Sequence, residues 1–173
     1  MDFLKAKPMS RKDIRTIAKR VRVMCNVPID MAFPIVDVME NFLSGLDEDD
    51  YVLEITDSHE LGSKYALTIP EKKVVKVRQD VYEEACKGDP HHLFTLAHEL
   101  GHAILHKDTT VSFARDTEII KHCERPEWQA NTFAGELIAP ADEVKGMTED
   151  EVVSKYKCSY KVAQIQLEQS LKI

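Results

Sequence analysis

The chain of 173 residues is long enough for one domain with a small appendage, and its 43% hydrophobic content can supply a core. Its net charge of -7 argues against non-specific nucleic-acid binding, which depends on clustered lysine and arginine. The four cysteines form no Cys-x-x-Cys pair, as is typical of reduced thiols in the cytoplasm. We find neither the regions of a signal peptide nor an apolar run near the ~20 residues of a membrane span, so we expect a cytoplasmic protein that does not enter a membrane.

Two helices are predicted in the N-terminal part of the chain. Residues 9–25 carry apolar side chains at helical spacing, with Ser10 as N-cap and Asp13 in capping-box position. The outer face of this helix is basic, and we interpret it as solvated rather than as a nucleic-acid or partner surface. A second helix, starting at Asp30 or near Pro34, ends at residues 44–45. The acidic residues that follow are interpreted as a solvated loop.

Three short strands with close turns are predicted next, at residues 51–55, 64–69 and 74–77. They suggest a small, mainly antiparallel sheet. An exposed edge strand of such a sheet can pair with an extended peptide, but the pattern does not show which strand lies at the edge. A helix is predicted over residues 80–87, ending at Gly88.

The next predicted helix contains a His-Glu-x-x-His motif. Asp89 is its expected N-cap and Pro90 its first residue. His98 and His102 lie one turn apart on one helical face, so both imidazoles can point at one zinc ion. Glu99 lies beside them, where it could act as the general base that takes a proton from the attacking water. This is the pattern of a zinc peptidase.

A catalytic zinc usually takes a third protein ligand, and the residues alone leave several candidates. Glu127 and Glu136 lie in a second predicted helix, half a turn apart, so that only one of them can face the site. His106 lies about 12 Å along the first helix from His98, so we interpret it as a structural residue or as a partner of a ligand. The thiol of Cys123 is a further, weaker candidate.

The combination of motifs is more specific than any one of them. The combined pattern is Phe94-Thr-Leu-Ala-His-Glu-Leu-Gly-His102, Leu105-His106 and Glu127-x-x-Ala130-Asn131-x-Phe133-Ala134-x-Glu136-Leu137-Ile138-x-Pro140. Together with residues 65–70 and 80–85, these segments resemble the ImmA/IrrE family of metallopeptidases. The resemblance extends over about residues 51 to 140.

The resemblance implies a compact α+β zincin-like domain, in which flanking helices and the small sheet surround the helix of the motif. It implies that His98, His102 and Glu127 bind Zn²⁺ and that Glu99 is the general base, and so it selects Glu127 over Glu136. Relatives are typically encoded with mobile elements, phages or stress regulons. The partner is therefore expected to be a helix-turn-helix repressor or an antitoxin-like regulator, which the enzyme would cleave.

The C-terminal tail is predicted to hold two short helices. Thr148 is the expected N-cap of the first, with Glu151 in capping-box position, and the second follows residues 157–159. Such a pair resembles a helix-turn-helix, but its mixed charges favour packing or partner docking, so we do not expect direct DNA binding. We therefore expect residues 1–146 to form the zincin-like domain, with residues 147–173 as a helical appendage packed on it.

Two functions remain open at this point. The first is hydrolysis of a peptide bond, with Tyr65, Tyr82 or His106 as candidate donors to the oxyanion. The second is a non-proteolytic regulator or toxin that uses its zinc domain to bind a partner. The substrate, the activating signal and the oligomeric state are not encoded in any motif that we find.

Overall fold

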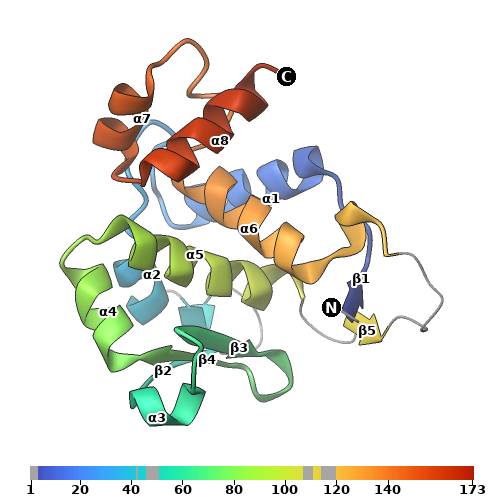
Figure 1. Ribbon diagram of the computed structural model, residues 1–173, viewed down its shortest axis with the longest axis vertical. Helices are drawn as coiled ribbons and strands as arrows, with labels where there is room; N and C mark the ends of the chain where they lie inside the picture. Colours follow the sequence, from blue (N-terminus) through green and yellow to red (C-terminus); the bar gives the residue numbers. More distant parts are fainter. Residues whose placement is uncertain (1–3, 42, 46–50, 107–110, 114–119) are drawn as a thin grey trace.

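Eight α-helices and two small sheets make up the part of the chain that the computed structural model describes, namely residues 4–41, 43–45, 51–106, 111–113 and 120–173 (Figure 1). The helices are α1 (Arg11–Met24), α2 (Ile35–Asn41), α3 (Ser58–Leu61), α4 (Gln79–Cys86), α5 (Pro90–Leu105), α6 (Pro126–Ile138), α7 (Glu149–Tyr156) and α8 (Tyr160–Ser170). The strands are β1 (Leu4–Ala6), β2 (Val52–Thr56), β3 (Ala66–Ile69), β4 (Val74–Arg78) and β5 (Val111–Phe113). The predicted α+β class is confirmed.

The helix ends follow the capping signals of the sequence. Ser10 accepts a hydrogen bond from the backbone N–H of Asp13, and the carboxylate of Asp13 accepts one from the backbone N–H of Ser10, which completes the predicted capping box. Asp89 accepts from the first two free N–H groups of α5. Thr148 and Glu151 form the second predicted capping box, at the start of α7. The acidic connector at residues 46–50 lies outside the described residues.

The main sheet is mixed, in the order β2-β4-β3, so the prediction of a mainly antiparallel sheet is wrong for one of its two pairings. β3 and β4 form the expected antiparallel hairpin, but β2 pairs parallel to β4, with Val52 opposite Val74. The predicted turn after β2 contains the short helix α3, and β4 rather than β3 lies next to β2. β4 takes the central position because its alternate residues Val75 and Val77 are fully buried.

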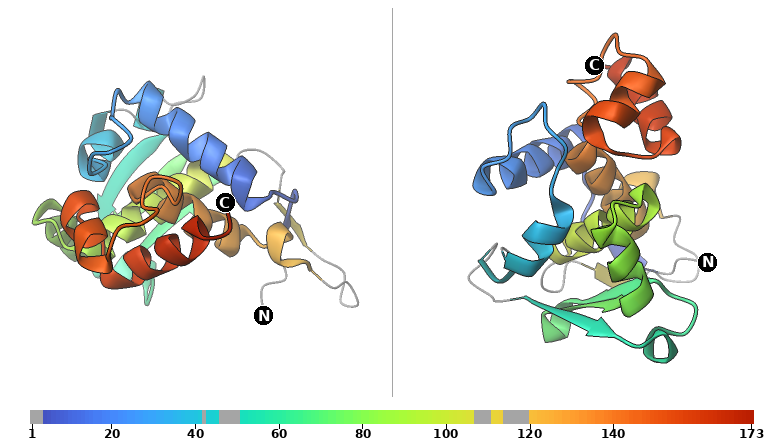
Figure 2. Two further views of the ribbon diagram at one scale, coloured as in Figure 1. Left: turned by 90° about the horizontal axis from the view of Figure 1, so that it is seen from above. Right: turned by 90° about the vertical axis from the view of Figure 1, so that its left-hand side faces the viewer.

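Apart from the short α3, the helices form layers on one side of this sheet. Figure 1 and Figure 2 show α2, α4 and α5 between the sheet and the helices α1, α6, α7 and α8. α5 packs on β3 and β4 with one side and on α6 with the other. α5 approaches α6 closely at Gly101, where an added Cβ would lie 3.0 Å from Phe133 and 3.3 Å from Ala130. The backbone of α5 at Gly101 therefore lies directly against the ring of Phe133 and the backbone of Ala130, with no room for a side chain of its own.

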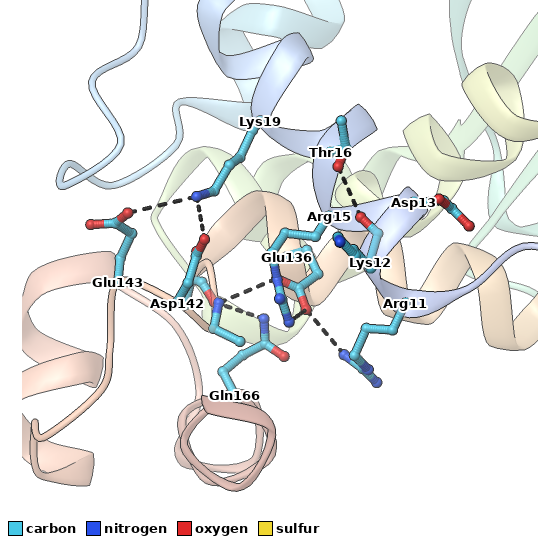
Figure 3. Close-up of polar contacts among 12 residues, drawn as sticks. Arg11, Lys12, Asp13, Arg15, Thr16, Lys19, Glu136, Asp142, Glu143 and Gln166 are labelled. Atoms are coloured by element: carbon cyan, nitrogen blue, oxygen red, sulfur yellow. Dashed lines mark hydrogen bonds and ion pairs between the residues drawn. The ribbon is translucent and has the colours of Figure 1, made fainter. Parts of the chain in front are cut away.

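The basic side chains of α1 connect it to the end of α6, so the interpretation of a wholly solvated face is wrong (Figure 3). Glu136 is fully buried and accepts from Arg15 at 2.9 and 3.1 Å and from Arg11 at 3.3 Å. Lys19 pairs with Asp142. Arg22 is 1% exposed and donates to three backbone carbonyl groups, including that of Leu137 in the last turn of α6.

The predicted C-terminal helices, α7 and α8, pack against the rest of the chain. Val152, Tyr156 and Val162 belong to the same apolar core as α5 and α6. Gln166 donates from its buried amide to the carbonyl of Ala139, just after α6. The predicted division at residues 146 and 147 remains a prediction. None of the described helices is both long and apolar enough to cross a membrane.

Candidate metal centre

Helix α5 places two imidazoles side by side, as the spacing of the motif predicts. Its N-terminus is fixed by Asp89 and Pro90, and its buried face includes Leu96, Ala97 and Leu100. On the opposite side, the Nε2 atoms of His98 and His102 lie 3.0 Å apart. Their side chains are 16% and 17% exposed, so both rings border the solvent.

Helix α6 supplies a carboxylate to the same point. Glu127 follows Pro126 in the first turn, where the unpaired N–H groups of the helix favour a negative charge. Its two oxygens lie 3.3 Å from Nε2 of His98 and 3.3 Å from Nε2 of His102. The adjacent imidazoles of His102 and His98 hold the pKa of Glu127 well below its usual range. Burial by itself would lower the pKa of His98, but the carboxylates of Glu127 and Glu99 outweigh it and raise that pKa.

The spacing of these three groups fits a tetrahedral zinc ion. Zinc–ligand bonds of about 2.0–2.1 Å separate neighbouring ligand atoms by about 3.3 Å in tetrahedral geometry. The measured separations in the triad of His98, His102 and Glu127 are 3.0–3.3 Å. Two imidazole nitrogens and one carboxylate are also a donor set found in catalytic zinc sites. In the part of the chain that the structure describes, this is the cluster of histidine, cysteine and acidic side chains that could hold a metal ion.

Glu99 lies next to the triad, in the wall of a cleft. The side chain is 7% exposed, and its Oε2 accepts a hydrogen bond of 2.7 Å from the hydroxyl of Thr68 in β3. The cleft has a volume of about 1030 Å³ and runs between β3, α5 and the start of α6. Its lining includes all three residues of the triad and Glu99. The carboxylate thus faces the same space as the prospective metal ligands.

Each imidazole of the triad is held by a further polar side chain. Nδ1 of His98 lies 3.0 Å from Oδ1 of Asn131, and Nδ1 of His102 lies 2.9 Å from Nδ1 of His106. His106 in turn contacts Oε1 of Gln129 at 2.9 Å. Burial lowers the pKa of His106 to about 4, so this imidazole is neutral at pH 7.

His106 thus lies beside the prospective ligand His102, which is one of the two roles expected for it, whereas the contacts of Asn131 and Gln129 were not predicted. Asn131 was part of the recognised motif without an assigned role. Gln129 is 1% exposed. An amide at a buried position of α6 was the signal that could have indicated a polar contact there.

The other candidates lie elsewhere. Glu136 is engaged with α1, and the thiol of Cys123 is not part of the triad. The hydroxyl of Tyr82 donates to Glu40 and not into the cleft. Tyr65 does line the cleft, but its ring packs against His91 and His92 in the first turn of α5. That turn lies about 10 Å along the helix from His98, given a rise of 1.5 Å per residue.

The comparisons with known proteins concern the family and the fold of the chain. A family model described as the IrrE N-terminal-like domain, of peptidase family M78, matches residues 51–168. No curated protein matches the chain. Among solved structures, a Mycobacterium tuberculosis transcriptional regulator is similar in fold, with a TM-score of 0.54 and 14% sequence identity.

The alignment with that regulator covers 88% of this chain but only 45% of the regulator. At this level of identity the likeness concerns the fold alone. The family model, in contrast, spans both α5 and α6 and so includes the whole triad and Glu99. The chain belongs to the M78 peptidase family of IrrE N-terminal-like domains.

Proposed function

We propose that the protein is a zinc-dependent endopeptidase that cleaves a regulatory protein. The observation that carries this proposal is the convergence of His98, His102 and Glu127, with the carboxylate of Glu99 beside them in an open cleft. These three residues would hold the zinc ion. When bound, zinc would supply Lewis-acid polarisation of a peptide carbonyl and of the attacking water.

Glu99 would move the proton in this reaction. Its carboxylate would take a proton from the water and later deliver it to the amine of the leaving peptide. The hydroxyl of Thr68 donates to Oε2 of Glu99, which fixes the orientation of the carboxylate and leaves its other oxygen available to the water. The contacts of Tyr65, Tyr82 and His106 do not identify any of the three as the hydrogen-bond donor to the oxyanion.

The edge strand β3 would hold the substrate. β3 pairs only with β4 among the described strands, so its outer edge is open on the side of the cleft. An extended peptide that pairs with this edge would pass both Thr68 and Glu99. Main-chain pairing gives affinity with little dependence on side chains, so a substrate segment must be extended or able to unfold locally.

A regulator of transcription is our proposed partner, in line with the family resemblance. The similar solved structure is itself described as a transcriptional regulator, which supports this context without identifying a substrate. A helix-turn-helix repressor or an antitoxin-like protein is the partner that we would test first. The cytoplasm is the compartment that we propose.

The decisive experiment compares the zinc-loaded wild type with Glu99→Gln. Both proteins are incubated with a soluble proteome, and new peptide N-termini are identified by mass spectrometry. Glu168→Gln, on the exposed face of α8, is the matched control. We expect about one zinc per chain in all three proteins, and new N-termini only with the wild type and Glu168→Gln.

The outcomes separate the two functions. Cleavage by the wild type that Glu99→Gln abolishes supports the peptidase, and enrichment of DNA-binding regulators among the cleaved proteins supports the partner. Zinc binding without any cleavage would overturn the peptidase and favour a non-proteolytic regulator. Loss of zinc in Glu99→Gln would contradict the assignment of Glu99 as a base rather than a ligand.

A further inference from the structure

A chain of hydrogen bonds leads from the metal triad to the N-terminal segment of the protein. It passes from Nδ1 of His102 to Nδ1 of His106 at 2.9 Å and from Nε2 of His106 to Oε1 of Gln129 at 2.9 Å. The amide nitrogen of Gln129 then contacts the carbonyl oxygens of Lys7 at 2.8 Å and Cys123 at 2.7 Å. Both His106 and Gln129 are at most 4% exposed, so water does not compete for these groups.

The two carbonyl oxygens at the end of this series, those of Lys7 and Cys123, determine which group donates in every hydrogen bond back to His102. A carbonyl oxygen can only accept, so the two partners of Gln129 require its NH₂ group and exclude a flipped amide. Oε1 of Gln129 must then accept a proton from Nε2 of His106. A neutral His106 is left with a lone pair on Nδ1, which must accept from the Nδ1–H of His102.

We infer that Gln129 is a positioning residue that selects the metal-binding tautomer of His102 through His106. With its proton on Nδ1, His102 presents the lone pair of Nε2 to the point where His98 and Glu127 converge. Gln129 itself touches neither the triad nor the cleft. This inference rests on the zinc site of the proposed function.

This series of hydrogen bonds connects the metal triad to residues that precede the family match. Lys7 lies between β1, which pairs with β5, and Met9, whose N–H donates to the carbonyl of Cys123 at 3.1 Å. That carbonyl also accepts from Gln129, so the N-terminal segment and the approach to α6 meet at one oxygen. The family model begins only at residue 51. The orientation of Gln129 is therefore supplied in part by this chain's own N-terminal segment.

The first measurement records the tautomers directly in the full-length, metal-free protein. Long-range ¹H–¹⁵N correlation spectra are collected at a pH where the imidazoles are neutral. We expect Nδ1–H for His102 and Nε2–H for His106. The opposite tautomer at His106 would overturn the inference. This result does not depend on zinc or on activity, so it can be told apart from a failure of the proposed peptidase function.

The second measurement compares Gln129→Met with Gln166→Met. Both positions are 1% exposed, and both amides donate to backbone carbonyl groups, but Gln166 lies in α8 and donates to Ala139. Zinc affinity is measured by competition of Zn²⁺ with a chromophoric chelator. We expect binding to weaken roughly 10- to 100-fold in Gln129→Met, with altered imidazole signals, and to stay within about twofold in Gln166→Met. Equal zinc affinities in the two variants would refute a specific positioning role for Gln129. If Gln129→Met does not fold, the tautomers measured in the wild type still test the inference.

Discussion

The buried carboxylate of Glu136 allows a quantitative test of how α1 is held on α6. Glu136 is fully buried, and Arg15, whose side chain is 13% exposed, contributes two hydrogen bonds to it at 2.9 and 3.1 Å. Burial alone would lower the pKa of Arg15, but the hydrogen bonds and the charge of Glu136 outweigh it and raise that pKa. Arg15→Met keeps most of the side-chain volume but leaves the carboxylate with Arg11 and the N–H of Ala141.

We expect Arg15→Met to lower the free energy of unfolding by about 3–5 kcal/mol, the usual cost of leaving a buried charge without its main partner. Arg11→Met should cost only about 1 kcal/mol, because Arg11 makes one contact of 3.3 Å and its side chain is 23% exposed. Adding Glu136→Gln to Arg15→Met removes the buried charge that has lost its main partner, and it should restore part of the lost free energy of unfolding.

Urea unfolding followed by circular dichroism measures these differences. With a slope of about 2 kcal/mol per M, the loss in Arg15→Met corresponds to a decrease of roughly 2 M in the midpoint. Lys12→Met, one exposed position of the same helix, is the control and should change stability by less than about 0.5 kcal/mol. Equal losses in Arg15→Met and Arg11→Met, or a double variant less stable than Arg15→Met, would refute the reasoning.

Two further perturbations test the packing. Gly101→Ala should lower the free energy of unfolding by about 1 kcal/mol or more despite a better helix propensity, because the new methyl group would lie 3.0 Å from Phe133. Gly45→Ala is the control, since nothing lies within 4 Å of a Cβ added there, and urea unfolding should show no such loss for it. A more stable Gly101→Ala would contradict the close approach. Burial raises the pKa of the Cys158 thiol from 9.0 to about 11, so this thiol loses its proton at a lower pH in the unfolded chain than in the folded protein. The free energy of unfolding should therefore fall as pH rises from 9 towards 11. The fall should be smaller in Cys158→Ala, and an identical pH dependence in both proteins would disprove the assignment.

Local signals in the sequence predicted the helices well. Caps at Ser10, Asp89 and Thr148 determine where helices begin, and each depends on residues only two or three positions apart. The same locality explains why His98 and His102 could be placed on one face from their spacing alone. Spacing could not choose between Glu127 and Glu136, because the orientation of α6 depends on its packing. The family resemblance selected Glu127, and the structure brings it to the two imidazoles.

The features that were missed depend on contacts between distant segments. The parallel pairing of β2 with β4 requires β4 to take the central position, which no turn signal encodes. The pairing of β1 with β5 joins residues over a hundred positions apart in the sequence and was not predicted. The basic face of α1 is typical of a solvated helix in the sequence alone. Its acidic and carbonyl partners lie in α6 and the residues after it, more than a hundred positions away in the sequence.

The distribution of partners around α6 has a consequence for the limits of the folding unit. Three polar groups of this helix have a partner among residues 4–24: Gln129 has Lys7, Glu136 has Arg15 and the carbonyl of Leu137 has Arg22. A fragment limited to the family match, residues 51–168, would contain every prospective metal ligand, but Glu136 would lose both arginines, the carbonyl of Leu137 would lose Arg22, and the amide of Gln129 would keep only one of its two acceptors. We therefore expect a fragment limited to the family match to be less stable than a chain that includes residues 4–24. Comparative work on the family should look, in each member, for the local helix that completes α6.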